Sequence, residues 1–435
     1  MQMSTEMPPD RGRILVDVSE TVGFNLRTGI QRVVRELLAH GLAGAAPRPV
    51  VPVMASGRHF HELSEAGWAR LHSAGGGGAS GRASTNQSAL RARVVQAMKR
   101  AAQATPALYN RLQRTYNDAL FERRSAALHK AEPIRIGPGD RILLADSFWG
   151  GAPTLKAAEQ AKADGAQVTL IAYDLIPFSH PQFCDARLVA NYQPLMSRAV
   201  ALSGQVFAIS EDCASAFRAQ FPAARVSAFR LGHDISKSHA RSTDEFAWPT
   251  NLWAGPGRVF VIVGSIEPRK GHRVVLEAFE RRWARGEPDK LLIIGKVGWQ
   301  VDDLVARIDR HDQSGRRLFH LHNASDAMLK EALERAHAGI IASYIEGFGL
   351  PLAESLAAGL PMLASDIRVF HEIAAEAALY FAPGDPAALD EAVDLLHRRH
   401  AEMVRAAAEF VWPDWREAAE DFYAVVEKQA ASAPD

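Results

Sequence analysis

The sequence contains very little cysteine: Cys184 and Cys213 are the only two among 435 residues. Two cysteines cannot build a disulfide framework or a cysteine-based zinc site, and their scarcity is typical of a reducing compartment. Long apolar runs are also missing, since the longest, such as VFVIVG and AGIIAS, are far shorter than a membrane-spanning helix. The first dozen residues, MQMSTEMPPDRG, lack the apolar centre of a signal peptide. These absences predict a cytoplasmic protein that does not cross a bilayer.

An excess of charge of one sign is absent as well. Lysine plus arginine number 50 and aspartate plus glutamate number 50, so the formal net charge is +0. No global field therefore attracts nucleic acid or a membrane surface, and we expect no nucleic-acid partner. Any attraction to a membrane has to come from a local cluster of basic residues.

The chain is about twice as long as a common domain, which favours two domains, each with a core of its own. Strand-like runs alternate with helical periodicity in both halves, which is typical of an α/β fold with parallel sheets covered on both faces. We predict a Rossmann-like domain over residues 1–235, a connection over 236–256, and a second Rossmann-like domain over 257–405. The remaining residues, 406–435, read as a kinked helix that packs back across the junction with the aromatic residues Trp412, Trp415, Phe422 and Tyr423.

One segment of the first half, residues 73–130, does not fit an ideal Rossmann-like domain and is predicted to be an insertion. It starts with the glycine- and serine-rich SAGGGGASGRASTNQS and continues as a basic helical region. A basic amphipathic surface of this kind suits peripheral contact with anionic lipid. A solvated helical hairpin that covers the first domain explains the same pattern. The basic residues between Ser88 and Lys130 are Arg91, Arg93, Lys99, Arg100, Arg111, Arg114, Arg123, Arg124 and Lys130, against Asp118 and Glu122.

The stretch YIEGFGLPLAE places two carboxylates, Glu346 and Glu354, where a strand gives way to a helix. Ligands of an open parallel sheet bind at the carboxyl ends of its strands, beside helix N-termini. We expect the amides of Gly347, Phe348, Gly349 and Leu350 to meet an anion there, because glycine allows close approach. The alternative is that Glu354 balances the helix dipole and Glu346 is a solvated loop residue.

A second strand-turn-helix unit, VGSIEPRKGH, places Arg269 and Lys270 at the mouth of the same predicted sheet. Adjacent cations at a strand end suit a diphosphate, arginine through its planar fork and lysine as a point charge. An exposed turn would explain this segment if it stood alone.

Together, these segments resemble the retaining glycosyltransferases of family 4, and the resemblance covers most of residues 259–381, including the complete E-x7-E motif. It implies the GT-B fold, two facing Rossmann-like domains with a cleft between them and a C-terminal helix that crosses back. By this resemblance, Glu354 would bind the ribose of a nucleotide sugar, while Glu346 and the Phe348 to Leu350 backbone would meet the transferred sugar and the phosphates.

The loop after the strand, with Gly264 and Ser265, would also bind the donor by this resemblance. Many family members carry arginine directly after the strand's glycine, where this chain has Ser265. We therefore expect Arg269 to supply the second positive charge beside Lys270. Catalysis is assigned to Glu346, Arg269 and Lys270.

The first half carries two further similarities. In NLRTGIQRVVRELLAHGL, Thr28 and Gln31 are spaced as a capping box, and Thr28 and Gly29 resemble the glycine loop that closes on donor phosphate and acceptor in the family. The alternative is a plain helix start. YDLIPFSHPQF resembles the HDLIP segment of bacterial polysaccharide mannosyl- and rhamnosyltransferases, with Tyr173 where histidine is frequent. Asp174 is a candidate ligand of an acceptor hydroxyl, or the cap of the following turn.

We expect neither a cofactor nor a metal. The histidine pairs His59 with His61 and His320 with His322 alternate along extended segments, but no carboxylate or thiol cluster is seen to complete either pair. The sequence also lacks Asp-x-Asp, the pattern with which many nucleotide-sugar enzymes hold a divalent cation.

The predicted function is the transfer of a hexose, with retention of configuration, from a nucleotide sugar to a glycan or a polyprenyl-diphosphate-linked acceptor in cell-surface polysaccharide synthesis. GDP-mannose or a related deoxyhexose donor is favoured by the resemblance, and the place of action would be the cytoplasm or the inner face of the membrane. Two alternatives stay open: a nucleotide-sugar epimerase of similar fold, and a non-catalytic subunit that binds nucleotide sugars.

Overall fold

The computed structural model describes residues 12–26, 28–73, 120–233 and 248–430. The chain forms two compact units, one of residues 1–171 with 191–206 and the other of residues 172–190 with 207–435. Most of the predicted basic insertion and of the predicted inter-domain connection lies outside the described residues. The domain boundaries expected from the sequence stay predictions. None of the described helices combines the length and apolar character that crossing a membrane would require.

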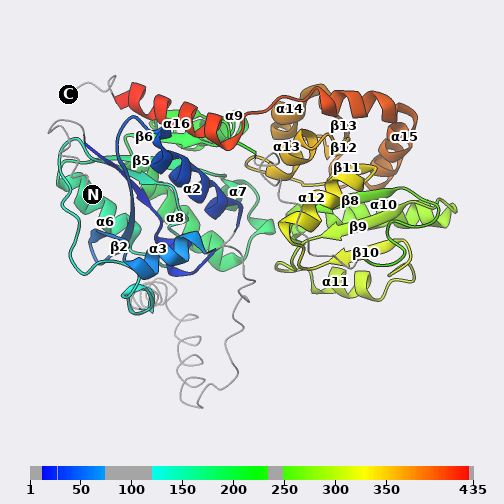
Figure 1. The fold of residues 1–435 in the computed structure, drawn as a ribbon, viewed down its shortest axis with the longest axis horizontal. Helices are drawn as coiled ribbons and strands as arrows, with labels where there is room; N and C mark the ends of the chain where they lie inside the picture. The colour runs from blue at the N-terminus through cyan, green and yellow to red at the C-terminus, as the bar shows by residue number, and fades with distance from the viewer. Residues whose placement is uncertain (1–11, 27, 74–119, 234–247, 431–435) are drawn as a thin grey trace, which may run out of the picture. The chain divides into compact units, whose positions relative to one another are not determined.

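A seven-stranded sheet has the strand order β3-β2-β1-β4-β5-β6-β7, and Figure 1 labels its strands β2, β5 and β6. Ile14 of β1 pairs in parallel with Val50 of β2 on one side and with Arg141 of β4 on the other. The order therefore changes direction between β1 and β4, and the loops that follow such a pair of strands are the usual place for a ligand. The strands are β1 (Ile14–Asp17), β2 (Val50–Ser56), β3 (His59–Glu62), β4 (Arg141–Leu144), β5 (Gln167–Ala172), β6 (Gln205–Ala208) and β7 (Val226–Ala228).

The edge strand β3 departs from the predicted parallel arrangement. It pairs antiparallel with β2, with Ser56 opposite His59 and Val53 opposite Glu62. Gly57 has a φ of 58°, which allows the tight turn between the two strands. His59 and His61, which the sequence showed as an alternating pair, thus belong to a hairpin.

The helices in this part of the chain include α2 (Gly29–His40), whose apolar face is buried as its periodicity predicts, with Val33, Val34 and Leu37 in the core. Phe121 is 1% exposed and contacts the ring of Phe24 at 5.5 Å, so the end of the predicted insertion is packed into the first unit. The others are α1 (Ser19–Gly23), α3 (Glu65–His72), α6 (Thr154–Ala163), α7 (Ile176–Ser179), α8 (Ala186–Leu202) and α9 (Glu211–Gln220).

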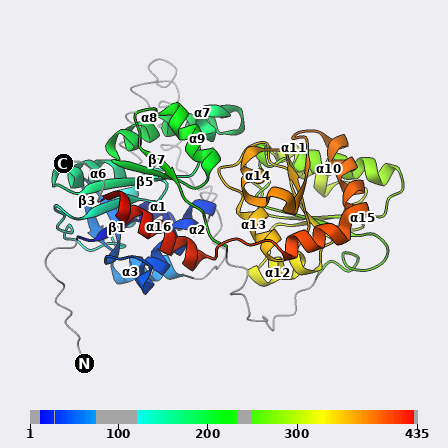
Figure 2. The ribbon, with the colours of Figure 1, turned by 90° about the horizontal axis from the view of Figure 1, so that it is seen from above.

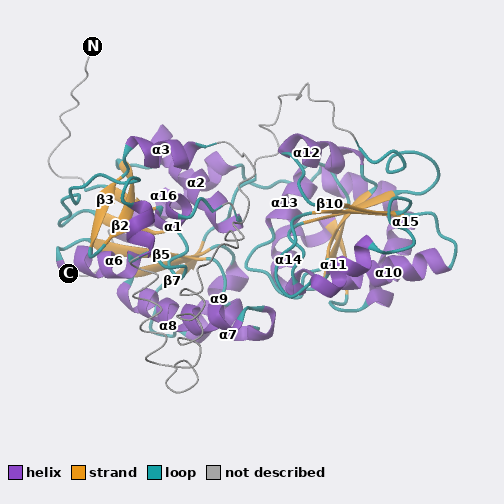
Figure 3. Cartoon of the chain, turned by 90° about the horizontal axis from the view of Figure 1, so that it is seen from below, coloured by secondary structure: helices purple, strands orange, loops and turns teal. Residues whose placement is uncertain are grey.

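A six-stranded sheet organises the second half, with the order β10-β9-β8-β11-β12-β13 and parallel pairs throughout. Helices surround it, as Figures 2 and 3 show. Its strands are β8 (Val259–Val263), β9 (Lys290–Ile294), β10 (Leu318–Leu321), β11 (Ala338–Ile341), β12 (Met362–Ser365) and β13 (Ala378–Phe381). Its helices are α10 (His272–Ala284), α11 (Asp302–Asp309), α12 (Asp326–Arg335), α13 (Leu350–Ala357), α14 (Arg368–Ala374) and α15 (Pro386–Ala408).

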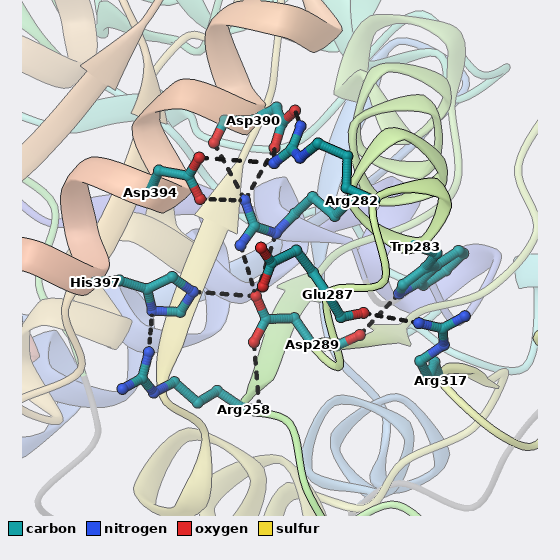
Figure 4. A network of polar contacts seen from close by, with 10 residues as sticks. Arg258, Arg282, Trp283, Glu287, Asp289, Arg317, Asp390, Asp394 and His397 are labelled. Atoms are coloured by element: carbon teal, nitrogen blue, oxygen red, sulfur yellow. Dashed lines mark hydrogen bonds and ion pairs between the residues drawn. The ribbon is translucent and has the colours of Figure 1, made fainter.

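A buried arginine joins α10 to α15 (Figure 4). The Arg282 guanidinium is fully buried, 2.8 Å from Asp289, 2.9 Å from Asp390 and 2.7 Å from Asp394. His397 of α15 contacts Asp289 at 3.0 Å. Burying a charge costs free energy unless partners surround it, so this network ties the helices together only while it is complete.

The C-terminal segment forms a separate helix, α16 (Trp415–Ala430), and the prediction of one kinked helix is wrong. Helix α15 ends at Ala408, and Pro413 lies in the extended link between the two helices. Trp415, Phe422 and Tyr423 are buried, as their aromatic face predicts. The ring of Phe422 lies 5.5 Å from Phe207 of β6 and 4.7 Å from Phe229, so α16 covers the end of the seven-stranded sheet.

Candidate active site at the carboxyl ends of the second sheet

The loops after β8 and β11 carry the predicted catalytic residues. Arg269 and Lys270 lie in a short 3-10 helix, Pro268–Lys270, that follows β8, and Glu346 lies in the loop that follows β11. Since β8 and β11 are neighbours in a parallel sheet, both loops leave the same edge. The amide of Tyr344 donates to the carbonyl of Arg269 at 2.8 Å, which fixes one loop against the other.

Glu346 is held by three donors. The Nη1 atom of Arg269 lies 2.7 Å from Glu346 Oε2, and the ammonium of Lys270 contacts Oε1. Ser343 donates its hydroxyl to the same Oε1 at 2.8 Å. The structure therefore brings together the three residues that the sequence assigned to catalysis.

Burial would raise the pKa of the Glu346 carboxyl, but Arg269 and Lys270 outweigh it and lower the pKa to about 2. Burial lowers the pKa of the Lys270 ammonium, and Glu346 opposes that change. At neutral pH Glu346 is thus an ion. It can accept hydrogen bonds and balance positive charge, but it has no proton to give.

A second carboxylate, Glu267, reaches Arg269. Its Oε2 atom lies 3.2 Å from Arg269 Nε, and the hydroxyl of Ser265 donates to its Oε1. The two cations therefore face two carboxylates in this structure. The sequence analysis gave Glu267 no role in the site. Glu267 stands two residues before Arg269 in VGSIEPRKGH, so its place after the same strand already suggested that it reaches the site.

Gly264 and Ser265 lie directly after β8. Gly264 has a φ of 143° and donates its amide to the carbonyl of Ile294 at 2.9 Å. A Cβ atom at Gly264 would meet no heavy atom within 4 Å, so the backbone borders open space there. This is the property that close approach by a ligand requires.

The Gly-Phe-Gly-Leu loop presents backbone, because its aromatic side chain is turned into the core. Phe348 is 4% exposed, and its ring lies 5.8 Å from that of Trp412. Gly349 has a φ of 122°, which a side chain would strain, and Leu350 begins helix α13. Glu354 is half-buried one turn into the same helix, as the sequence predicts for this strand-loop-helix unit.

Gly347 has a packing reason to be glycine. A Cβ atom there would lie 1.9 Å from the carbonyl oxygen of Tyr173, and Ser210 donates its hydroxyl to the Gly347 carbonyl at 2.7 Å. Tyr173 belongs to the segment 172–190, which is part of the second unit. Tyr173 itself is buried.

Asp174 lies in the same segment and caps the turn after β5, since its Oδ1 accepts from the amide of Ile176 at 3.0 Å. Burial raises the pKa of Asp174, and the nearby charge of Arg269 opposes the rise. Asp174 therefore belongs to the electrostatic surroundings of Arg269, and its turn-capping role, one of the two sequence interpretations, is present.

Thr28 and Gly29 lie in the first unit, where Thr28 and Gln31 form the predicted capping box at the start of α2. The amide of Gln31 then donates to Asp146 Oδ1 at 3.2 Å and to Ser147 Oγ at 3.1 Å. The start of α2 is thus attached to the end of β4.

Sequence reasoning missed a buried acidic cluster in the first unit, made of Asp17, Glu20 and Asp146. Burial raises the pKa of Asp17 to about 7 and that of Glu20 to about 8, and it raises the pKa of Asp146 as well. Asp17 ends β1 and Asp146 follows β4, on either side of the point where the strand order changes direction. The sequence did contain a signal for this cluster, because the strand-like runs RILVD and RILLAD each end in an aspartate.

The prediction that no carboxylate accompanies His320 and His322 is wrong. Asp309 lies beside both, and one ligand atom of each of the three residues falls within 4.8 Å of the others. The sequence separates Asp309 from His320 by a loop, so only the tertiary structure shows the group.

Part of the chain that carries these loops is similar to known proteins. Residues 246–409, which include the loops described above, match the sequence model of a family described as "Glycosyl transferases group 1". The serotype-specific mannosyltransferase WbdA of Escherichia coli is 31% identical over 306 residues, which cover 66% of this chain and 37% of WbdA. This chain resembles bacterial mannosyltransferases and has the GT-B fold.

The GT-B fold, with two Rossmann-like domains, is supported by sucrose-phosphate synthase from Thermosynechococcus elongatus. The likeness covers 97% of this chain and 100% of that one, with a TM-score of 0.58 at 16% identity. The O-antigen chain mannosyltransferase RfbU of Salmonella typhimurium is 28% identical over 136 residues, 31% of this chain and 37% of RfbU. The chain thus spans little more than a third of the length of these curated relatives.

Proposed function

We propose that the chain transfers a hexose from a nucleotide sugar to a glycan, with retention of configuration at the anomeric carbon. The observation that carries this proposal is the Glu346 carboxylate between Arg269 and Lys270, within a region that matches group 1 glycosyl transferases. The E-x7-E motif that Glu346 and Glu354 form supports membership of the retaining family 4.

In this reaction the bond between the anomeric carbon and the diphosphate breaks, and its electron pair leaves on the diphosphate. A bond forms from the acceptor hydroxyl oxygen to the anomeric carbon, and the proton of that hydroxyl passes to the departing diphosphate. Arg269 and Lys270 stabilise the charge that grows on the diphosphate, which is the main electrostatic demand of the step. The amides of Phe348 to Leu350, at the start of α13, add their partial positive charge.

Glu346 has a different role. Its pKa of about 2 keeps it ionised at neutral pH, so it has no proton to donate, and it also makes the carboxylate a weak base. A fixed carboxylate near the transferred sugar orients the sugar hydroxyls and keeps the two cations in place until the diphosphate arrives. Glu354, on α13, would bind the ribose of the donor.

The favoured donor is GDP-mannose or a related deoxyhexose donor, because the resemblance to bacterial mannosyltransferases extends through the segments with Thr28 and Tyr173. The acceptor would be a glycan or a polyprenyl-diphosphate-linked glycan of a cell-surface polysaccharide. The basic stretch from Ser88 to Lys130 would bring the chain to such an acceptor at anionic lipid on the inner face of the membrane. Side-chain cations and helix ends meet the phosphates, so transfer should need no divalent cation.

The test is a transfer assay with the untagged chain and radiolabelled GDP-mannose, UDP-glucose and dTDP-rhamnose, each with and without mannose-containing oligosaccharide acceptors. Transfer that depends on the acceptor and is lost in Glu346→Gln supports the proposal. Conversion of the donor sugar without acceptor would instead indicate an epimerase. Donor binding without transfer or hydrolysis, with every donor and acceptor, would indicate a binding subunit.

A further inference from the structure

We propose that Asp309, His320 and His322 form a binding site for a divalent transition metal of the Zn²⁺ class, made of residues that the proposed transfer reaction does not use. One ligand atom of each residue lies within 4.8 Å of the others. Two imidazoles and one carboxylate are a donor set that suits Zn²⁺, with the fourth position left for water.

The strongest support for this metal site is the orientation of the His320 ring. Its Nε2 atom lies 3.0 Å from the carbonyl oxygen of Gly295, which can only accept, so Nε2 carries the proton. In the neutral ring Nδ1 then presents a lone pair. This Nδ1 is buried, and among the residues that the structure describes it has no hydrogen-bond partner. A metal-binding histidine commonly donates its other nitrogen to a backbone carbonyl in this way, which fixes the tautomer and the ring orientation.

Such a buried acceptor is costly to leave unpaired, and a metal ion would satisfy it. The second histidine lies beside the first, since the ring centroids of His320 and His322 are 3.8 Å apart with an interplanar angle of 42°. Ligand atoms of a tetrahedral zinc site lie about 3.4 Å apart, given zinc-to-ligand distances of about 2.0–2.2 Å. Asp309 and His322 are exposed, so side-chain rotation can close the remaining gap.

The three residues lie on or directly beside regular secondary structure. Asp309 is the last residue of α11, His320 lies in the edge strand β10, and His322 follows that strand directly. The site therefore lies at the edge of the six-stranded sheet, where β10 is the outermost strand among the described residues. A metal there would connect the end of α11 to the edge strand, and we expect it to stabilise this edge rather than take part in sugar transfer.

The experiment uses the untagged full chain, stripped of metal with a chelator and dialysed. Calorimetric titration with Zn²⁺ should give one site per chain, and Co²⁺ should develop the visible absorption of a site with nitrogen ligands. Zn²⁺ should also raise the melting temperature of the chain. His322→Gln should weaken binding by at least about tenfold, and Asp309→Asn and His320→Gln should do the same.

His371→Gln is the matched control. His371 is a partly exposed histidine that contacts a single carboxylate, with its Nε2 2.7 Å from Asp366 Oδ1. Its replacement should leave Zn²⁺ affinity and the Co²⁺ spectrum unchanged. The absence of binding to the wild-type chain, or equal loss in His371→Gln and His322→Gln, would overturn the proposal. His322 is exposed, so misfolding would not explain a loss in that variant, and the melting temperature without metal checks this.

Discussion

The Nη1 atom of Arg269 lies 2.7 Å from the Oε2 atom of Glu346, although 77 residues separate them in the sequence. The pair is partly buried, and Lys270 and Glu267 complete a cluster of two cations and two carboxylates. A nucleoside diphosphate that binds there has to share the cations with carboxylates already in contact with them. In the proposed reaction, the cluster would therefore set both the affinity for the diphosphate and the rate of its departure.

Glu346→Gln should separate these two effects. Removing one negative charge leaves Arg269 and Lys270 freer to bind phosphate, so the affinity for the nucleoside diphosphate should rise, by roughly threefold to tenfold. Turnover should fall by roughly 100-fold or more, because an interaction with the transferred sugar in the transition state is lost. Calorimetry and steady-state kinetics measure the two quantities.

Glu280→Gln is the control for that change, since Glu280 also lies between two partners, Arg307 and His311, but on α10. It should alter neither quantity. Wild-type turnover in Glu346→Gln would show that Glu346 has no part in the reaction.

Arg269→Met and Lys270→Met should each weaken binding of the nucleoside diphosphate by roughly 1.5–3 kcal/mol, the size of a charge-assisted hydrogen bond. Arg273→Met is the control, because Arg273 lies at the start of α10, close to Lys270 in the sequence, but is exposed and contacts Asp303. This change should have little effect on the affinity for the nucleoside diphosphate. Calorimetric titration at two salt concentrations makes the comparison, and unchanged affinity in both site variants would place the phosphates elsewhere.

The stability of the chain should fall as pH rises from about 5 to about 8, through Asp17 and Glu20. Their folded pKa values, about 7 and about 8, lie above those of the unfolded chain. The native state therefore keeps protons that the unfolded state releases, and this stabilisation is present at low pH and lost as pH rises through the folded values. Asp17→Asn and Glu20→Gln should each flatten the dependence, by on the order of 1–4 kcal/mol.

Urea unfolding at pH 5 and pH 8 measures this dependence. Glu65→Gln is the control, because Glu65 is exposed in the first turn of α3. If Asp17→Asn and Glu20→Gln both keep the full pH dependence of the free energy of unfolding, the raised pKa values of these two carboxyls are contradicted.

Arg282→Met should destabilise the second unit by roughly 3–5 kcal/mol, since it removes the buried guanidinium between Asp289 and Asp390 and leaves Asp390 with only the more exposed Arg285 and Arg281. Arg281→Met, one position earlier, should cost less than about 1 kcal/mol. Arg281 is mostly exposed and lies 3.8 Å from Asp390. Thermal unfolding compares the two variants, and equal shifts would mean that the network contributes no more than a surface ion pair.

The α/β alternation, the strand positions and the two loops with Glu346 and Arg269 were determined by the sequence itself. Local patterns carry this information: apolar runs such as VFVIV form buried strands, and glycine and proline mark where a strand ends and a helix begins. The buried face of α2 and its capping box follow from spacing within one helix in the same way.

Other features were decided by the tertiary structure, because they join residues that are distant in sequence. The raised pKa values of Asp17 and Glu20 depend on how deeply the carboxyls are buried, which no local pattern states. The antiparallel β3 depends on which neighbour accepts its backbone hydrogen bonds. Asp309 joins His320 only because α11 ends beside β10. Burial and contact set these properties, and both arise only when separate segments pack together.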